Sequence, residues 1–556
     1  MVPRPEYPRP SLRRREWENL NGEWEFATGE TPRFDRHILV PFCPESKLSG
    51  IGELPGDVAW YRRTFDAPRA ERLRVHFGAV DYRATVWVND VEVARHEGGH
   101  TPFSADVTGA VRGRGNVLVV RAEDPLRDKT IPRGKQHWTE QPEGIFYTPT
   151  TGIWQTVWLE PLPARHVRGL RLRGDLDSGA LDFEIDGDGA AELVVTFAGR
   201  PAGRWSGSAG RAQIRLEHRQ PWHPDTPALY DVEVTMRDEE GRVADRVESY
   251  FGLRKIEARD GRVWLNGEPF VQRLVLDQGY FPEGLLTAPS DDHLRADIEL
   301  ARACGFNGAR KHQKVEDPRW LYWADRLGYL VWSEMPSFHK HSAEAEHRLM
   351  REWADVVRLH RDHPSVAAWV PANESFGLEQ IDPSVRSDFL VRLHRMTHEL
   401  DGSRPAVSND GWEHALTDLC TLHDYSPPAD LAAHCRSLEA ALHARAANHD
   451  LYGPGFGYRG EPLLITEFGG LRLSQSGGWG YIEVPDAEHL LRAYEGLIRA
   501  LMQAGPVEGF CYTQLTDVEQ EQNGLFAYDR TPKLDPALLR AITQMPKRRA
   551  NGSGAG

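Results

Sequence analysis

Cysteine is scarce in this chain and follows no recognisable pattern. Among 556 residues there are only five, Cys43, Cys304, Cys420, Cys435 and Cys511, and none belongs to a C-x-x-C pair. An odd and scattered set argues against a disulfide framework and against a structural zinc site. We therefore expect a reducing, cytoplasmic location. Carboxylates such as Glu334 and Glu374 could hold magnesium or calcium, but they show no compact ligand spacing, so we expect no metal and no cofactor.

Long apolar runs are missing as well. No stretch approaches the 18 apolar residues typical of a membrane-spanning helix, and the first residues, MVPRPEYPRP, lack the hydrophobic segment of an export signal. The sequence therefore supports neither a membrane partner nor secretion.

An excess of positive charge is also lacking, since the formal net charge is -15. Proteins that bind nucleic acids usually carry a basic face, so nucleic acid is excluded as the main partner. Aromatic residues, in contrast, are abundant, with 17 tryptophans and 16 tyrosines. Most will pack in cores, but flat indole faces also stack on sugar rings, and the composition leans toward carbohydrate.

The length exceeds what one hydrophobic core usually organises, so several domains are expected. Residues 1–163 contain short alternating runs such as VAWYRRTF and RATVWVND, which predict an antiparallel jelly-roll β-sandwich. Residues 164–254 repeat this pattern in some seven shorter strands, as in an immunoglobulin-like β-sandwich. The last residues, 549–556, are rich in Gly, Ser and Ala and are expected to be disordered.

Residues 255–548 alternate apolar runs with helical patterns, for instance FVQRLVLD followed by DDHLRADIELARACG. Eight strand candidates of this kind predict a (β/α)8 TIM barrel, whose site lies at the carboxyl ends of the strands. Polar residues cluster at those ends and not at the amino ends. They are Asp277, Arg310, His312, Glu334, Asn373, Glu374, Asn409, Asp410, His423, Tyr425, Glu467, Gln514 and Asp517.

Two of these strand ends carry glutamates that could work as a pair. The run AAWVPANES reaches Asn373 and Glu374, and the run PLLITEFGG reaches Thr466 and Glu467. Cleavage of a glycosidic bond with retention needs one carboxylic acid to protonate the leaving oxygen and one carboxylate to attack the anomeric carbon. The two glutamates are therefore candidates for these roles.

The order of the motifs resembles glycoside hydrolase family 2, which includes β-galactosidases and β-glucuronidases. The resemblance covers about residues 8 to 545 and is carried by YPRPSLRRREWENLNGEWEF, GIFYTPTTGIWQTVWLE, FNGARKH, DRLGYLVWSEMP, WVPANES and ITEFGG. It implies that Glu374, after strand four, is the general acid and base, and that Glu467, ending strand seven, is the nucleophile.

The resemblance also implies supporting roles around the pair. Asn373 is expected to bond the sugar 2-hydroxyl, and Arg310 is expected beside Glu467, where its charge keeps the nucleophile ionised. His423 and Tyr425 resemble the strand-six pair, whose phenol would bond Glu467. A satisfied core tyrosine is the alternative for Tyr425.

Other positions are left more open. His312 is expected to reach the sugar, and Glu334 is either a substrate ligand or an ion-pair partner of Arg310. Trp412 and Trp479 are stacking platforms or packing residues. Gln514 is an uncertain contact, because YTQLTDVEQEQNG replaces the Trp-containing ending of the best-known members, and Asp277 is included for its place at a strand end.

The predicted activity is an exo-acting, retaining glycoside hydrolase for a terminal β-glycoside, with a β-galactoside as the first expectation. β-Glucuronidase, β-galacturonidase and α-L-arabinopyranosidase are the alternatives on the same scaffold. Uronic-acid recognition in characterised glucuronidases resembles an Asn-x-Lys pattern, and this chain has no such pattern. Arg310 or Lys311 could supply the positive charge instead. Outside hydrolysis, the alternatives are a non-catalytic carbohydrate-binding protein and a transglycosylase. The resemblance leaves a homo-oligomer open.

Overall fold

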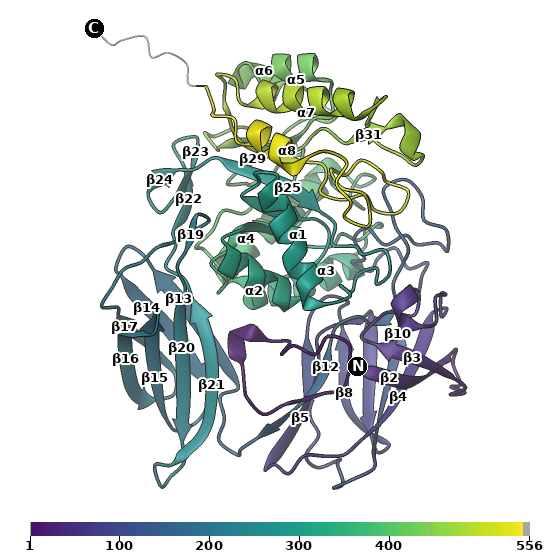
Figure 1. The fold of residues 1–556 in the computed structure, drawn as a ribbon, viewed down its shortest axis with the longest axis vertical. Helices are drawn as coiled ribbons and strands as arrows, with labels where there is room; N and C mark the ends of the chain where they lie inside the picture. Colours follow the sequence, from purple (N-terminus) through teal and green to yellow (C-terminus); the bar gives the residue numbers. More distant parts are fainter. Residues whose placement is uncertain (1, 446–447, 549–556) are drawn as a thin grey trace.

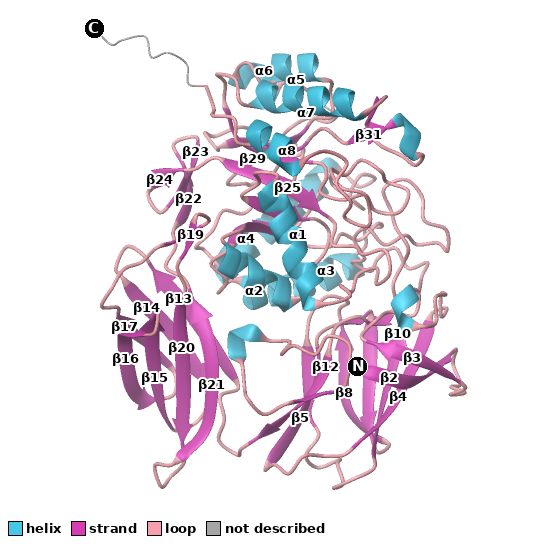
Figure 2. Cartoon of the chain, viewed as in Figure 1, coloured by secondary structure: helices cyan, strands magenta, loops and turns pink. Residues whose placement is uncertain are grey.

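The computed structural model describes residues 2–445 and 448–548, so the expected disordered tail at 549–556 lies outside the described residues. Two β-sandwiches lie side by side below a domain in which strands and helices alternate (Figures 1 and 2). No helix in the described part of the chain is long and apolar enough to cross a membrane. All five cysteines are buried and unpaired.

The first sandwich contains two antiparallel sheets of six and four strands. Its sequence alternates buried and half-buried residues with a period of two, as β10 does along its whole length, so each sheet has one face in the core. The six-stranded sheet consists of β3 (Arg36–Val40), β2 (Gly22–Thr28), β4 (Val58–Phe65), β10 (Asn116–Glu123), β7 (Arg83–Val88) and β8 (Val91–Glu97). The four-stranded sheet consists of β1 (Glu18–Asn19), β12 (Val157–Leu162), β5 (Arg72–Phe77) and β9 (Phe103–Asp106).

The second sandwich has seven strands in sheets of three and four, as an immunoglobulin-like fold requires. One sheet is formed by β13 (Gly169–Asp175), β14 (Ala180–Asp186) and β17 (Arg211–Arg215). The other is formed by β16 (Arg200–Ser208), β15 (Ala190–Phe197), β20 (Tyr230–Arg237) and β21 (Val243–Phe251). Its core is separate from that of the first sandwich.

The third domain is the expected barrel. Seven parallel strands form one curved sheet in the order β28 (Val366–Val370), β27 (Leu330–Glu334), β26 (Gly308–Lys311), β25 (Gln272–Asp277), β33 (Val507–Tyr512), β30 (Leu463–Glu467) and β29 (Cys420–His423). The covering helices are α1 (Asp291–Ala303), α2 (Pro318–Leu327), α3 (Ala343–His360), α4 (Pro383–Leu400), α5 (Pro428–His434), α6 (Leu438–Leu442), α7 (Ala487–Leu501) and α8 (Pro536–Thr543). Local signals set their ends: α2 begins at Pro318 after the Asp317 cap and ends at Gly328 in the left-handed conformation.

The segment expected as the fifth strand, around residues 405–410, closes the barrel without being a regular strand. It forms short parallel bridges with β28 at Trp369 and with the chain after β28 at Asn373, for instance from Val407 N to Trp369 O at 2.8 Å and from Glu374 N to Asp410 O at 2.9 Å. On its other side, Gly411 N donates to the Thr421 side chain at 3.2 Å. No strand ladder forms on this side in the described residues, since Asp418 N donates to Ala406 O at 3.0 Å but β29 pairs with β30 alone. The eight expected strands therefore become seven strands and one bridging segment.

The amino end of the barrel is closed by a small sheet of β22 (Ile256–Arg259), β23 (Arg262–Leu265) and β24 (Glu268–Pro269). Ile256, Val263 and Leu265 pack in one buried cluster with barrel residues such as Leu274 and Trp332. The opposite, carboxyl end of the strands is therefore the end that can admit a ligand.

The residues that precede β1 connect all three domains. Arg4 pairs with Asp317 of the barrel at 3.0 Å, and Leu12 packs in the core of the second sandwich. The Arg14 side chain is only 6% exposed and joins Asp245 of the second sandwich, at 2.8 Å, to Glu160 of the first, at 3.4 Å. This short segment therefore fixes the sandwiches to each other.

We predict that Arg14→Met lowers the free energy of unfolding by about 3 kcal/mol, because it leaves the buried carboxylate of Asp245 without its cation, while Glu160 keeps Arg9 at 2.9 Å. Thermal and denaturant unfolding would measure the loss. Arg13→Met is the matched control, because Arg13 is 59% exposed and lies 3.6 Å from Glu248, and its loss should stay below about 0.5 kcal/mol. Equal effects of the two substitutions would contradict the role of Arg14.

Candidate active site

The two glutamates at the ends of strands four and seven face the same space. β30 ends at Glu467, and Glu374 follows β28 by a short turn. One carboxylate oxygen of each glutamate and one ring nitrogen of His423 all lie within 4.8 Å of one another. Carboxyl groups about 5–5.5 Å apart are the spacing of retaining glycosidases, whereas inverting enzymes need a wider gap.

Arg310, on β26, is the cation around which the site is assembled. Its guanidinium is fully buried and lies 3.0 Å from Glu467, 2.5 Å from Asp410 and 3.0 Å from Glu334. These residues come from four different parts of the barrel wall, and their convergence follows from the parallel register of the strands. A single positive charge thus holds three strand ends together.

Glu467 is held in its ionised form. Burial alone would raise its pKa, but the positive charges of His423 and Arg310 outweigh burial and lower the pKa below the usual range. The Tyr425 hydroxyl also donates to Glu467 at 2.6 Å. An ionised carboxylate with one oxygen on Arg310 and the other on Tyr425 is oriented for attack on an electrophile.

His423 links the two glutamates. Its Nδ1 lies 2.6 Å from Glu374, and its Nε2 lies 3.2 Å from Asp410. Burial opposes its charge, but Glu467 and Asp410 raise its pKa to about 10. At neutral pH the imidazole is therefore protonated and donates from both nitrogens.

Two groups within the described residues bring three metal-ligand side chains together: Glu374, His423 and Glu467, and, on the α4 side of the barrel, His394, His398 and Asp418. A protonated imidazole cannot bind a metal. In the first group the charge of His423 therefore favours ion pairing over a metal ion. In the second, both histidines are near Asp418, at 3.4 and 2.7 Å.

One of the two polar atoms of the Asn373 side-chain amide has no partner among the described residues. Its Oδ1 accepts from Arg310 at 2.9 Å, while its buried Nδ2 finds no acceptor in the part of the chain that the structure describes. A buried donor without a partner carries a desolvation cost that a ligand acceptor would remove. The amide thus offers an N–H beside Glu374.

The loop after Asn373 is held in an unusual backbone conformation. Glu374 and Ser375 have φ values of 51° and 55°, in the left-handed region. Asn409 stabilises this turn by accepting from Ser375 N at 2.9 Å, and Ser375 Oγ donates to Glu413 at 2.6 Å. Strain of this kind persists only where surrounding contacts enforce it, and here it orients the Glu374 side chain.

Glu334 and His312 surround Arg310 from the side of strands two and three. Of the two alternatives for Glu334, the structure shows the ion pair with Arg310, and the buried carboxylate also lies 2.9 Å from His312 Nδ1. Burial raises the pKa of Glu334 to about 7 and lowers that of His312 far below its usual value. His312 is therefore neutral.

Asp277 and Gln514 are not part of this group. Leu274 and Leu276 of β25 point into the barrel core, so Asp277 lies on the opposite face of the strand, where it pairs with Lys311 at 2.8 Å. Gln514 is fully buried between Gln278, at 3.0 Å, and Asn523, at 2.7 Å. Both side chains are already bonded, and their expected contact with a sugar has no support from the geometry.

Neither cation proposed for a uronic acid is free. Arg310 is compensated by three carboxylates, and Lys311 is paired with Asp277 and Glu316, both at 2.8 Å. The expectation that one of them could supply a positive charge to a substrate is therefore not supported.

Aromatic side chains flank the carboxylates. Trp412 stacks on His449, with ring centroids 4.5 Å apart, and contacts His423 by its edge at 5.5 Å. Tyr481 stacks on Tyr425 at 3.4 Å, and Trp479, 36% exposed, packs against Tyr481 at 4.6 Å. Both predicted tryptophans thus lie near the site, in contact with residues that touch it.

A long loop of the first sandwich, residues 124–151, reaches the mouth of the barrel. Gly134 lies so close to the barrel that a Cβ atom at this position would be 2.3 Å from the Gln313 carbonyl oxygen. Tyr147 donates to Glu521 at 2.6 Å, and Phe146 lies 6.1 Å from the ring of Phe376, just after Glu374. Phe146 and Tyr147 of this loop therefore form part of the wall of the site.

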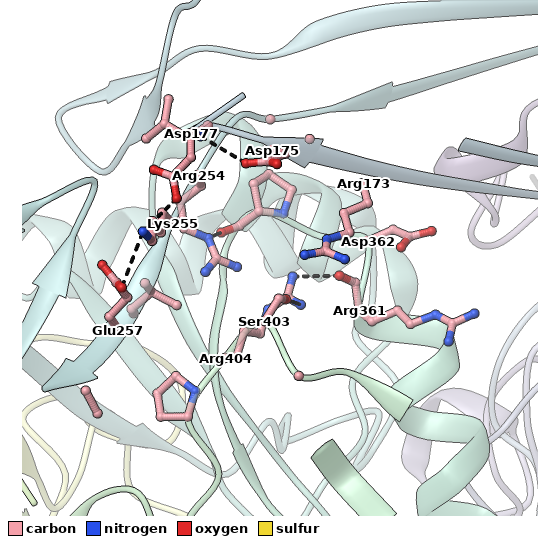
Figure 3. A pocket seen from close by; sticks show the side chains of 18 of the residues that line it. Arg173, Asp175, Asp177, Arg254, Lys255, Glu257, Arg361, Asp362, Ser403 and Arg404 are labelled. Carbon is pink, nitrogen blue, oxygen red and sulfur yellow. Dashed lines mark hydrogen bonds and ion pairs between the residues drawn. The ribbon is translucent and has the colours of Figure 1, made fainter. Parts of the chain in front are cut away.

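A large cavity of the described structure lies elsewhere. It has a volume of about 440 Å³ and lies between the second sandwich and the amino end of the barrel, lined by charged side chains such as Arg254, Asp362 and Arg404 (Figure 3). None of the predicted site residues lines it. The convergence of perturbed charges marks the site better than cavity size does.

Sequence reasoning assigned no role to three residues that the structure brings into play. Asp410 was recognised only as a polar strand end, yet it lies between Arg310 and His423. Lys135 and Glu521 come from loops with no strand-end signal. For Lys135 the one available signal was its position within a long Gly- and aromatic-rich turn.

Comparison with known proteins identifies the class of this molecule. The models "Glycosyl hydrolase 2 galactose-binding domain-like", "Glycosyl hydrolases family 2" and "Glycosyl hydrolases family 2, TIM barrel domain" match residues 48–151, 166–254 and 256–488, respectively. The protein is a three-domain glycoside hydrolase acting on β-glycosides. More particularly, the chain belongs to glycoside hydrolase family 2.

The relatives carry two names. A β-glucuronidase from Paenibacillus borealis is 24% identical, with 96% of this chain and 98% of that protein covered. A β-galactosidase from Thermoanaerobacter pseudethanolicus is 27% identical over 66% of this chain, which spans about half, 51%, of that protein. Among solved structures, a Ruminococcus gnavus β-glucuronidase in complex with D-glucuronic acid has a TM-score of 0.79 at 18% identity, covering 98% of this chain and 100% of that one.

We predict that Arg310→Met destabilises the protein by about 3–5 kcal/mol, because it leaves Glu334, Asp410 and Glu467 buried without their shared cation. Denaturant unfolding would measure the change. Arg127→Met, at an exposed position, is the control and should change stability by less than about 0.5 kcal/mol. A fully stable Arg310→Met protein would show that the three carboxylates do not depend on this cation.

Proposed function

We propose that this family 2 β-glycosidase is a retaining enzyme that removes a terminal sugar through a covalent intermediate, with Glu467 as nucleophile and Glu374 as acid and base. The observation that carries the proposal is the approach of their carboxylate oxygens to within 4.8 Å. The division of roles rests on charge: Glu467 is bonded to Arg310 and Tyr425, while the only ionisable partner of Glu374 within the described chain is His423.

The reaction has two displacements. Glu467 attacks the anomeric carbon and forms the glycosyl ester, while Glu374 gives its proton to the departing oxygen. Glu374, now a carboxylate, takes a proton from water, whose oxygen attacks the anomeric carbon and releases Glu467. During both steps the free Asn373 N–H is available to the 2-hydroxyl, where a bond strengthens as positive charge develops on the ring.

For the sugar itself, two candidates stand. A β-galactoside was the first expectation from sequence, and the β-galactosidase relative supports it. A β-glucuronidase relative, matched over 98% of its length, supports a β-uronide. A panel of p-nitrophenyl β-galactoside, β-glucuronide, β-galacturonide and α-L-arabinopyranoside separates these, and proton NMR of the first product formed tests retention of the β configuration.

The two other classes are tested in the same assays. A carbohydrate-binding protein would leave every aryl glycoside intact over hours. A transglycosylase would convert added methanol to methyl glycoside as its main product. A cytoplasmic location also remains part of the proposal, supported by five buried, unpaired cysteines.

We predict that Glu467→Gln reduces kcat by more than about 10⁴-fold, because the nucleophile is lost. Glu374→Gln should reduce kcat/KM, which reports the first displacement, by about 10²–10⁴-fold for p-nitrophenyl or alkyl glycosides, but far less for a 2,4-dinitrophenyl glycoside, whose leaving group needs no proton. Glu379→Gln, an exposed glutamate in the same loop, is the control and should keep full activity. Equal loss at Glu374 on all leaving groups would overturn the assignment of the acid.

We also predict a shift in the pH profile for Tyr425→Phe. The nucleophile must be ionised, so kcat/KM falls as pH drops through the pKa of Glu467, and the Tyr425 hydroxyl helps to lower that pKa. Removing the hydroxyl raises the pKa, so the acid limb should move to higher pH. Tyr322→Phe, on α2, should leave the limb in place. An unmoved limb in Tyr425→Phe would show that the bond does not tune Glu467.

A further inference from the structure

Lys135 is a buried cation without a counter-ion. It belongs to the loop of the first sandwich that reaches the barrel mouth, and the residue is only 5% exposed. Its ammonium group lies between two aromatic rings, 5.7 Å from the centroid of Phe146 and 5.5 Å from that of Phe376. Within residues 2–445 and 448–548 the ammonium group makes no ion pair within 4.0 Å and no hydrogen bond.

The position of Lys135 is fixed from three sides. Gly134 lies directly against the Gln313 carbonyl, next to His312 at the end of strand two. Phe376 follows Glu374 after strand four, and Tyr147 holds Glu521 after strand eight at 2.6 Å. Lys135 therefore lies over the mouth of the barrel, on the side of the proposed acid.

The charges around the mouth are consistent with this placement. Burial lowers the pKa of His312, and the positive charge of Lys135 is the next contribution. Glu521 feels the same charge but does not pair with it, because its oxygens are bonded to Tyr147 at 2.6 Å and Asn523 at 3.1 Å. The ammonium group thus has acidic neighbours but no ion pair.

Other buried lysines of this chain are compensated, and they show what Lys135 lacks. Lys311 and Lys314 share Glu316, at 2.8 and 2.9 Å, and Lys533 pairs with Asp517 at 2.6 Å. An uncompensated buried charge destabilises a protein strongly. An ammonium group without an ion pair, at the entrance for a ligand, can therefore bind an anion.

We propose that Lys135 binds a carboxylate group of the substrate. The inference rests on the proposed function, because it takes the barrel mouth as the place where a glycoside binds. The carboxylate could be that of a uronic acid in the sugar that is cleaved off, or it could belong to an acidic unit on the leaving side. In both cases the first domain, and not the barrel, supplies the residue that selects an acidic substrate.

The test compares wild type, Lys135→Met and Lys135→Arg on three p-nitrophenyl substrates and one further probe. The substrates are the β-glucuronide, the β-galacturonide and the neutral β-galactoside, and the probe is a 4-carboxyphenyl β-galactoside, which carries its charge on the leaving side. Arg127→Met is the matched control, since it removes an exposed positive charge from the same loop.

Lys135→Met should lower kcat/KM by about 10- to 100-fold on the acidic substrate class, and leave the neutral galactoside within about threefold, because a hydrogen bond to a charged group is lost. Lys135→Arg should restore much of the loss. Loss confined to the uronides places the carboxylate on the cleaved sugar, and loss confined to the carboxyphenyl galactoside places it on the leaving side. Equal loss on charged and neutral substrates, or no loss on either acidic class, would overturn the proposal.

Calorimetric binding of free D-glucuronate, D-galacturonate and 4-carboxyphenol, against D-galactose, separates failure of this proposal from failure of the proposed function. Wild type that binds one of the carboxylates through Lys135 but cleaves no glycoside would refute the enzyme and keep the binding residue. Wild type that cleaves glycosides but binds these carboxylates no better than Lys135→Met does would refute the residue and keep the enzyme.

Discussion

The buried guanidinium of Arg310 is the constraint on which the site depends. It touches Glu334, Asp410 and Glu467, which belong to three different strand ends, and it also donates to Asn373. Without this cation, the burial of three carboxyl groups in so small a volume would be uncompensated. The same interaction therefore holds the strand ends together and keeps the buried carboxylate of Glu467 ionised at the mouth of the barrel.

The protonated His423 complements this arrangement. It lies between Glu374 and Asp410, so the positive charge of the site is spread over two side chains and reaches both glutamates. Glu467 receives charge from both cations, whereas Glu374 contacts only the imidazole. Two identical side chains acquire different surroundings in this way, which is how paired carboxylates come to do different work.

Much of the fold and the core of the site could be predicted from sequence because they follow local rules. Period-two strands, the later alternation of strand and helix, and polar residues at strand ends are all properties of short segments. They placed Glu374, Glu467, Arg310, His423 and Tyr425 on one rim, and the family match is consistent with the architecture. The segment expected as the fifth strand was harder to predict. Whether it forms a regular strand depends on pairing with neighbouring segments of the barrel and not on its own sequence.

Two further differences have physical reasons. The run that ends at Asp277 is apolar on both faces, so its pattern could not reveal that Asp277 faces the helices and pairs with Lys311. Lys135 and Asp410 matter through contacts with distant segments, which no local pattern encodes. Tertiary packing between domains decides those positions.

The loop of the first sandwich has an evolutionary consequence. The paired glutamates of the site and the wall beside them lie on separate domains, joined by contacts such as Tyr147 with Glu521 and Phe146 with Phe376. Mutations in the loop can therefore reshape the entrance while the chemistry on the barrel is inherited unchanged. Ligand choice in such a molecule can diversify faster than its reaction.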